Sequence, residues 1–158
     1  MNYGTREVIE LLVFDENGNK VAHLDSLKQS YLKTSQGYSP YLYIKDALLN
    51  YDLLEFSHAE VKNNRSDYEK ELNNEKDFKE ISYNPKLVKK CKLIAKTLYR
   101  TDDTKEDKEV YFNIPNAKTN GAIDFTSCNE GEPSTFDSVF SIHSYNENGD
   151  IFKIRIEQ

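Results

Sequence analysis

The sequence has 158 residues and a formal net charge of −6, with 30% charged and 37% hydrophobic residues. This balance is typical of a soluble globular protein and excludes a disordered one. The acidic charge argues against a protein that grips nucleic acid, because phosphate binding needs a concentrated basic surface. No apolar run of the sequence approaches the roughly 20 residues of a membrane span, and no hydrophobic leader follows a basic start. We therefore expect one domain over residues 1–158, synthesised in the cytoplasm, with a charged insertion or arm at about 60–84.

Aromatic content and cysteine usage narrow the class further. Eleven Tyr and eight Phe occur with no Trp, and flat rings of this kind suit pleated sheets. Cys91 and Cys128 are too few for a disulfide framework and lack CxxC spacing. We interpret both as reduced packing residues in a mainly β protein.

The first predicted unit is a β-hairpin. Residues 6–14 form an almost unbroken apolar run, which predicts a strand covered on both faces. The turn at 15–19 contains Asn17-Gly18 and leads into a second strand, Lys20 to Leu24. The polar stretch 26–40 then reads as a strand end followed by an exposed loop.

A short strand and one helix follow. Tyr41 to Ile44 is a strand candidate, and the apolar residues of 46–54 recur at helical spacing. We expect a helix of two to three turns that begins at Lys45 or Asp46 and lies across an open face of the sheet.

The stretch from Glu60 to Asn84 is dominated by Lys, Glu, Asp and Asn, with few large apolar residues. A capping-box sequence at 66–69 allows a surface helix from about residue 67. Two interpretations stay open: a solvated excursion from the sheet, or an arm whose sparse aromatic residues meet a partner subunit.

Residues 86–99 fit two patterns. Leu87, Cys91 and Ile94 match helical spacing behind an Asn-Pro start signal, while period two also fits the same stretch. We predict a strand from about Lys90, because residues 101–105 then make a hairpin loop to a strand at Val110 to Ile114.

The C-terminal third predicts two successive hairpins joined by a corner at 129–137. Val110, Phe112 and Ile114 alternate with polar residues, as in a half-buried strand. Phe140 and Ile142 alternate likewise, and Asn148-Gly149 leads to alternating Phe152, Ile154 and Ile156. Because Asn-Gly suits a tight turn, we expect the last two strands to pair with each other.

Chemistry-bearing motifs are absent from the sequence. His23, His58 and His143 stand on three different predicted elements without metal-ligand spacing. The acidic turn at 15–19 lacks the glutamate that closes a calcium loop, since Ser26 occupies that position. Ser134 and Thr135 have no base nearby and no strand-to-helix elbow, and no glycine-rich phosphate loop occurs. We expect no enzyme, no cofactor and no metal.

The corner Glu130-Gly131-Glu132-Pro133-Ser134-Thr135-Phe136-Asp137 resembles a family of tail-tube-type structural proteins from tailed bacteriophages of Gram-positive hosts. In that family a strand pair like Ile114 to Lys118 runs into a G-[DE]-P-[ST]-T-F-D corner, followed by a strand, an acidic Asn-Gly turn and a closing strand. Weaker similarity covers residues 24–28, 44–48 and 91–100. The charged stretch 60–84 has no counterpart in this resemblance.

The resemblance implies a β-sandwich or barrel flanked by an α-helix, assembling into hexameric rings that stack into a tube. The chain would be a virion component made in the bacterial host cytoplasm, with copies of itself and other tail proteins as partners and no membrane. Free sheet edges and long loops would serve this assembly, and an acidic lumen would let DNA pass without specific binding. Expected inter-subunit contacts are Tyr31, Tyr38, Tyr41, Tyr68, Leu72 and Phe78. Expected lumen residues are Asp102, Asp103, Glu106 and Asp107, with Asp15, Glu16 and Glu109 as further candidates.

Other functions stay open at this stage. A head or neck protein, such as a decoration or connector protein, would share the sandwich but would not stack. An enzymatic or small-ligand-binding β domain would need a pocket that gathers two of the scattered histidines. A DNA-binding module ranks lowest, because the net charge is −6.

Overall fold

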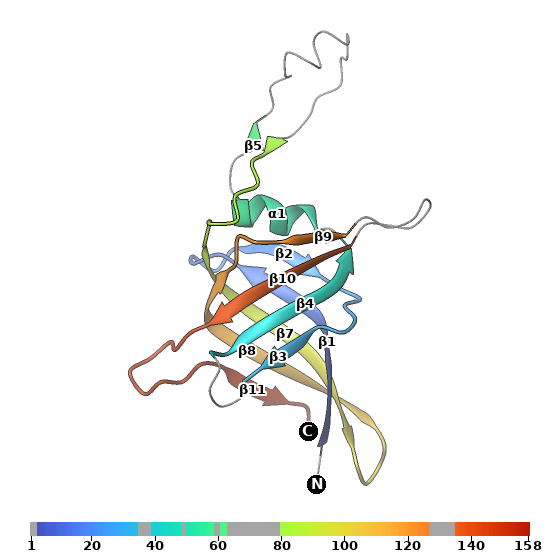
Figure 1. Cartoon of the computed structure of the whole chain (residues 1–158). Helices are drawn as coiled ribbons and strands as arrows, with labels where there is room; N and C mark the ends of the chain where they lie inside the picture. The colour runs from blue at the N-terminus through green and yellow to red at the C-terminus, as the bar shows by residue number, and fades with distance from the viewer. Residues whose placement is uncertain (1–2, 35–38, 49, 59–60, 63–79, 127–134) are drawn as a thin grey trace.

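The computed structural model describes residues 3–34, 39–48, 50–58, 61–62, 80–126 and 135–158 (Figure 1). Nine strands of this part form one antiparallel sheet, two more form a separate short ladder, and one helix flanks the sheet. The predicted mainly β fold with a flanking helix is therefore confirmed. The elements are β1 (Tyr3–Phe14), β2 (Lys20–Leu24), β3 (Tyr31–Lys33), β4 (Tyr41–Leu48), α1 (Tyr51–His58), β5 (Val61–Lys62), β6 (Glu80–Ile81), β7 (Lys90–Thr101), β8 (Asp107–Thr119), β9 (Asp124–Thr126), β10 (Thr135–Ile142) and β11 (Lys153–Ile156).

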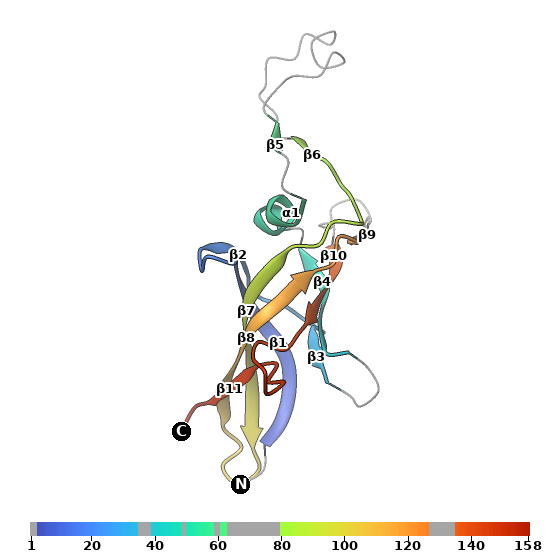
Figure 2. The same cartoon turned by 90° about the vertical axis from the view of Figure 1, so that its left-hand side faces the viewer.

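The large sheet curls into a barrel. Its strand order is β2-β1-β7-β8-β10-β4-β3, with β11 also on β8 and β9 on β10. The chain just before β3 returns to β1, where the Val8 N–H donates to Ser30 O at 2.8 Å and the Leu27 N–H donates to Ile9 O at 3.0 Å. Strands β2, β1, β7, β8 and β11 thus form one layer, and β9, β10, β4 and β3 form the other (Figure 2).

Alternation along the strands fills the space between the layers. Val110, Phe112 and Ile114 are buried as predicted, and Leu42 and Ile44 face them from the opposite layer. Because successive side chains of a strand point to opposite faces, each strand adds every second residue to this core. In β1, however, only one face is fully covered: Leu11 and Val13 are buried, while Leu12 is half-exposed, so the expected cover on both faces is wrong.

The first hairpin is confirmed. Strand β1 pairs with β2 in register Leu12 to His23, and the turn between them places Gly18 at a φ of 86°. An Asn-Gly turn needs this positive angle, which glycine adopts without strain.

The helix lies later in the chain than predicted. Strand β4 continues to Leu48, and α1 spans Tyr51–His58 instead of beginning at Lys45 or Asp46. Asn50 begins the helix, because its Oδ1 accepts the Leu53 N–H at 2.9 Å. This N-cap contact satisfies a donor that the first helical turn leaves unpaired, a signal that outweighs the apolar spacing around it. The helix packs against β2 and caps one end of the barrel (Figure 1).

The ambiguous stretch 86–99 is a strand from Lys90, as predicted. Strand β7 lies between β1 and β8 and pairs with both along most of its length. Residues 102–106 form the turn of the β7–β8 hairpin, which projects from the end of the barrel opposite α1 (Figure 1).

The predicted pairing of the last two strands is wrong. The Asn-Gly turn does form, with Gly149 at a φ of 86° and the Tyr145 N–H donating to Asp150 O at 2.9 Å. It closes only a short excursion, however, because β10 pairs with Ala117–Thr119 of β8 and β11 pairs with Val110–Asn113 of the same strand. Strands β10 and β11 therefore lie end to end along one edge of β8.

Pro115 explains this arrangement. The β7–β8 register shifts opposite Pro115, which offers no N–H to a neighbouring strand. Just beyond it, Asn116 O accepts the His143 N–H at 2.9 Å and Asn116 Nδ2 donates to Ser144 O at 2.7 Å. At this kink β8 changes its neighbour on that side: β11 pairs with it before Pro115, and β10 pairs with it after Pro115.

Candidate assembly surfaces

The root of the arm is held by a buried polar cluster at the α1 end of the barrel. His58 is 2% exposed, and its Nε2 lies 3.2 Å from Gly121 O. Because a carbonyl oxygen only accepts, the proton of this contact belongs to Nε2. Ser57 Oγ lies 2.9 Å from His58 Nδ1, and the Tyr83 ring stacks on the imidazole with centroids 5.1 Å apart. The Tyr83 hydroxyl accepts the Ile123 N–H at 3.0 Å.

Position 121 needs a glycine because a side chain there would clash with neighbouring backbone atoms, and not because of its backbone angles. A Cβ built on it would lie 2.5 Å from Leu87 O and 2.7 Å from Asn84 O. The chain that returns from the arm therefore runs directly against the β8–β9 connection. Strands β5 and β6 leave the barrel beyond this point, at the end opposite the β7–β8 hairpin (Figures 1 and 2).

The predicted inter-subunit residues fall into two groups. Tyr38, Tyr68, Leu72 and Phe78 lie outside the described residues. Tyr31 and Tyr41 lie on the β3–β4 layer with ring centroids 6.3 Å apart, and Tyr43, which the sequence analysis did not single out, lies 5.3 Å from Tyr31. A signal for Tyr43 was present, because it alternates with buried residues of the same strand.

Two of these tyrosines, Tyr41 and Tyr43, have a raised pKa. A hydrogen bond with Tyr31, and then burial, raises the pKa of Tyr41. Burial, and then the neighbouring Asp137, raises the pKa of Tyr43, whose hydroxyl donates to Asp137 Oδ2 at 3.3 Å. The three rings form an aromatic patch on the outer face of this layer.

The four predicted lumen carboxylates lie together at the β7–β8 hairpin. Asp102, Asp103, Glu106 and Asp107 are all exposed. Cations accompany them: Arg100 Nε lies 3.2 Å from Asp107 Oδ1, and Lys108 Nζ lies 4.0 Å from Glu106. With Lys105 included, four carboxylates and three cations leave this hairpin with a net charge of −1. The lumen assignment stays a prediction, with less negative charge than the carboxylates alone would give.

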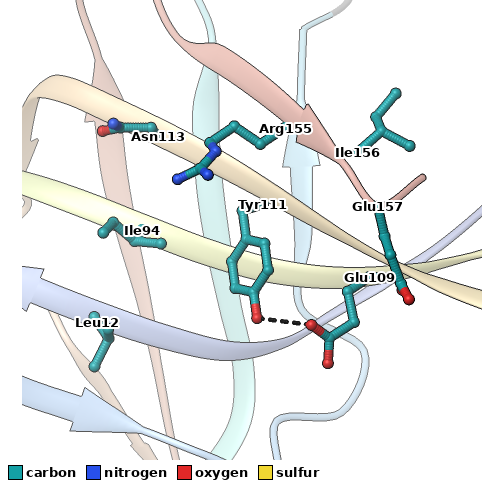
Figure 3. Close-up of a pocket in the computed structure, with 8 residues that line it drawn as sticks. All are labelled: Leu12, Ile94, Glu109, Tyr111, Asn113, Arg155, Ile156 and Glu157. Atoms are coloured by element: carbon teal, nitrogen blue, oxygen red, sulfur yellow. Dashed lines mark hydrogen bonds between the residues drawn. The ribbon is translucent and has the colours of Figure 1, made fainter.

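The outer face of the first layer carries a groove of about 490 Å³ (Figure 3). Leu12 and Ile94 lie at one end, Glu109 and Glu157 at the other, and Tyr111 between them. Its remaining lining residues are Asn113, Arg155 and Ile156.

Charged contacts fix the acidic end of this groove. Glu109 lies 2.9 Å from Lys96 Nζ and accepts the Tyr111 hydroxyl at 3.0 Å, which together lower the pKa of Glu109. Arg155 forms no ion pair within the described part of the chain. The groove therefore presents a cation and an apolar floor, with carboxylates at one end.

Strand β11 forms the open edge of the same layer. The predicted alternation exists, yet all four of its residues are exposed, with Ile154 at 52% and Ile156 at 38%. The Glu157 N–H donates to Glu109 O at 2.9 Å, so residues 157, 155 and 153 direct their backbone groups to β8. The N–H and C=O groups of Ile154 and Ile156 therefore point outward, where no strand of the described residues pairs with them.

A second cleft, of about 350 Å³, opens beside β11 between the two layers. Phe152 and Ile154 lie on one side, Tyr31 and Leu32 on the other, and Phe112 lies at the base, with its ring 5.3 Å from that of Phe152. The apolar side of β11 thus borders an aromatic cleft instead of a closed core.

The described residues show no constellation typical of catalysis. His23 contacts Glu10 at 2.6 Å, His58 belongs to the arm root, and His143 contacts Ser141 at 3.0 Å, so each histidine has a separate environment. No three potential ligands gather there as a metal site would need. Burial raises the pKa of the Cys91 thiol to about 12, which makes it a poor nucleophile. No helix of the described part has the length and hydropathy of a membrane span.

Comparison with known proteins supplies the family. The model of the YomU/Tube protein family matches residues 61–154, more than half of the chain. The matched range includes the charged stretch that had no counterpart in the resemblance, and it extends through the corner at 130–137 to β11. No curated protein and no solved structure matches. The chain therefore belongs to the YomU/Tube protein family, a phage tube-like family of structural proteins.

Proposed function

We propose that this chain is a tail-tube subunit of a bacteriophage, which assembles through copies of itself into stacked rings of six around a DNA conduit. Membership of the YomU/Tube family carries the proposal. The protein would act as a virion component without catalysis, contacting other tail proteins at the ends of the tube.

The shape of the barrel supports stacking. Its two ends differ: one holds α1 and the root of the arm, and the other holds the β7–β8 hairpin (Figure 2). A stack of identical rings needs two different, complementary ends, because a head-to-tail contact repeats without closing on itself. The buried His58 cluster holds the root of the arm at the α1 end, and in this proposal the arm contacts the next ring.

The charge of the chain fits a conduit. A net charge of −6 repels the phosphates of DNA and favours passage over adhesion. In this proposal the carboxylates of the β7–β8 hairpin face the lumen, and the Tyr31 and Tyr41 surface and the arm make contacts between subunits.

Deletion of residues 62–82 tests the role of the arm. The expected result is a folded barrel that forms no species larger than a dimer in sedimentation velocity, because the contacts that the arm makes between subunits are lost. Replacing the same residues by a Gly-Ser linker of equal length is the matched control for chain connectivity and should behave like the deletion. Multimers of normal size in either variant would refute this use of the arm.

A further inference from the structure

Strand β11 has the features of a strand that pairs with another strand. Its outward backbone groups belong to Ile154 and Ile156, which are also its two exposed apolar side chains. In the described part of the chain, Ile156 O receives only the side-chain amide of the exposed Gln158, at 3.2 Å. An open edge with unpaired backbone groups and one apolar face is a template for pairing with a further chain.

The sequence of the strand is complementary to itself. Residues 153–157 read Lys-Ile-Arg-Ile-Glu, with two cations and one carboxylate on the same face. In an antiparallel pair centred on Arg155, Lys153 of one copy lies opposite Glu157 of the other. In a pair centred on Ile156, Arg155 lies opposite Glu157. Both registers place Glu157 opposite a cation and let outward N–H and C=O groups bond across the strands. The register centred on Arg155 also places the two Arg155 side chains opposite each other, so the charges favour the register centred on Ile156.

From these observations we infer that two copies of this chain pair edge to edge through β11, antiparallel, with Glu157 of each copy opposite a cation of the other. Strand β11 of the second copy extends the first layer, and in the register centred on Arg155 its Ile156 lies opposite Ile154, which borders the aromatic cleft beside β11. Arg155, which has no ion pair among the described residues, gains a carboxylate neighbour in both registers.

This pair is a closed, two-fold contact, so it cannot grow into a filament. It covers the outward backbone groups of β11. The inference does not rest on the tube proposal, because it follows from the strand alone. A strand pair of this length buries less than the roughly 1,000 Å² of a stable interface, so the dimer should be weak.

Cysteine crosslinking detects a weak pair and reads its register. In a Cys128→Ser background, with Cys91 left in place because it is only 2% exposed, Arg155→Cys and Ile156→Cys are each oxidised at increasing protein concentration. Each register brings one of these positions next to its own copy across the two-fold axis, within reach of a disulfide. One of the two variants should form disulfide dimers at least tenfold faster than Lys153→Cys, an exposed control on the same strand.

Reversing the charges of β11 gives an independent test of the dimer. Lys153→Glu and Arg155→Glu together should weaken the dimer at least tenfold in sedimentation equilibrium, because like charges then face Glu157. Adding Glu157→Lys should restore it, while Glu147→Lys, the same change on the turn before β11, should not. Equal crosslinking rates at positions 153, 155 and 156, or a charge-reversed variant that dimerises normally, would overturn the inference. If the protein forms tubes but neither cysteine variant crosslinks, the β11 pair is refuted and the proposed function is not. If a variant crosslinks but the protein forms no tubes, the proposed function is refuted and the β11 pair is not.

Discussion

Two edge strands of one sheet layer, β2 and β11, have opposite fates. Strand β2 is covered: α1 packs on it, and Asn50 Nδ2 donates to the outward His23 O at 3.1 Å. Strand β11 is short and open, with Ile154 half-exposed. Both strands are edges of the same antiparallel layer. They differ because α1 and Asn50 lie beside β2, whereas no described element lies beside the outer edge of β11. The comparison shows that this fold covers one edge with its own helix and leaves the other edge open among the described residues.

The largest expected effect is a difference between β2 and β11 in how much an alanine substitution lowers the free energy of unfolding. Leu24 of β2 is 4% exposed, and Leu24→Ala should lower the free energy of unfolding by roughly 2–5 kcal/mol, because it leaves a cavity in the core. Ile154→Ala removes a similar side chain from β11 and should change stability by less than about 1 kcal/mol. Urea unfolding of both variants measures the difference, and equal losses would show that β11 is no open edge.

A smaller loss of stability is expected at Gly121, whose carbonyl oxygen contacts His58 at the end of α1, the helix that covers β2. Gly121→Ala places a methyl group against backbone oxygens of Leu87 and Asn84 and should lower stability by roughly 1–3 kcal/mol. Hydrogen exchange of the α1 amides should become faster in this variant. Gly149→Ala, whose Cβ meets no atom within 4 Å, is strained only by its positive φ and should leave exchange in α1 unchanged. Unaltered α1 protection in Gly121→Ala would exclude the anchor.

Asn50 joins the helix to the covered edge by two different groups. Asn50→Ala removes the cap of α1 and the donor to His23 O, and should lower stability by about 1 kcal/mol in denaturant titrations. Asn50→Asp keeps the oxygen that caps Leu53 and loses only the donor. A loss in Asn50→Asp as large as in Asn50→Ala would assign the effect to the β2 edge instead of the helix cap.

The smallest expected effect is the pH dependence of stability that comes from Glu109, the residue of β8 beside the end of β11. The hydrogen bond from Lys96, followed by that from Tyr111, lowers the pKa of Glu109 from its ordinary value of 4.5. A carboxylate with a lowered folded-state pKa stabilises the fold above its ordinary pKa, and this contribution is lost as pH falls through the lowered value. Because Glu109 is exposed to solvent and salt, the effect should be small.

Thermal unfolding between neutral pH and pH 3 checks this prediction. Glu109→Gln should destabilise the protein slightly at neutral pH, and the difference from the wild type should shrink as the pH falls. A difference that grows on acidification would contradict the assignment.

Local signals in the sequence predicted much of this fold, and contacts between distant residues decided the rest. Alternation around Phe112 and the Asn-Gly turn at Gly18 specify a buried face and a hairpin on their own. Alternation in β11 predicts a strand but cannot say which strand it pairs with, because that depends on the kink of β8 at Pro115. The helix start likewise followed the Asn50 cap and not the apolar spacing before it.

The candidate surfaces were less accessible to sequence analysis. The acidic residues of the β7–β8 hairpin were found, but their pairing with Arg100 and Lys108 appears only once the hairpin is folded. The His58 cluster unites residues from α1, the returning arm and the β8–β9 connection, which no short motif brings together.

Electron microscopy of the concentrated, purified protein tests the central claim most directly. The account predicts stacked rings or rods with a central channel, in which each barrel points its arm end toward the hairpin end of the next. If the protein stays as isolated barrels and dimers, both alone and after addition of a tail-derived template, that result would contradict a tube subunit.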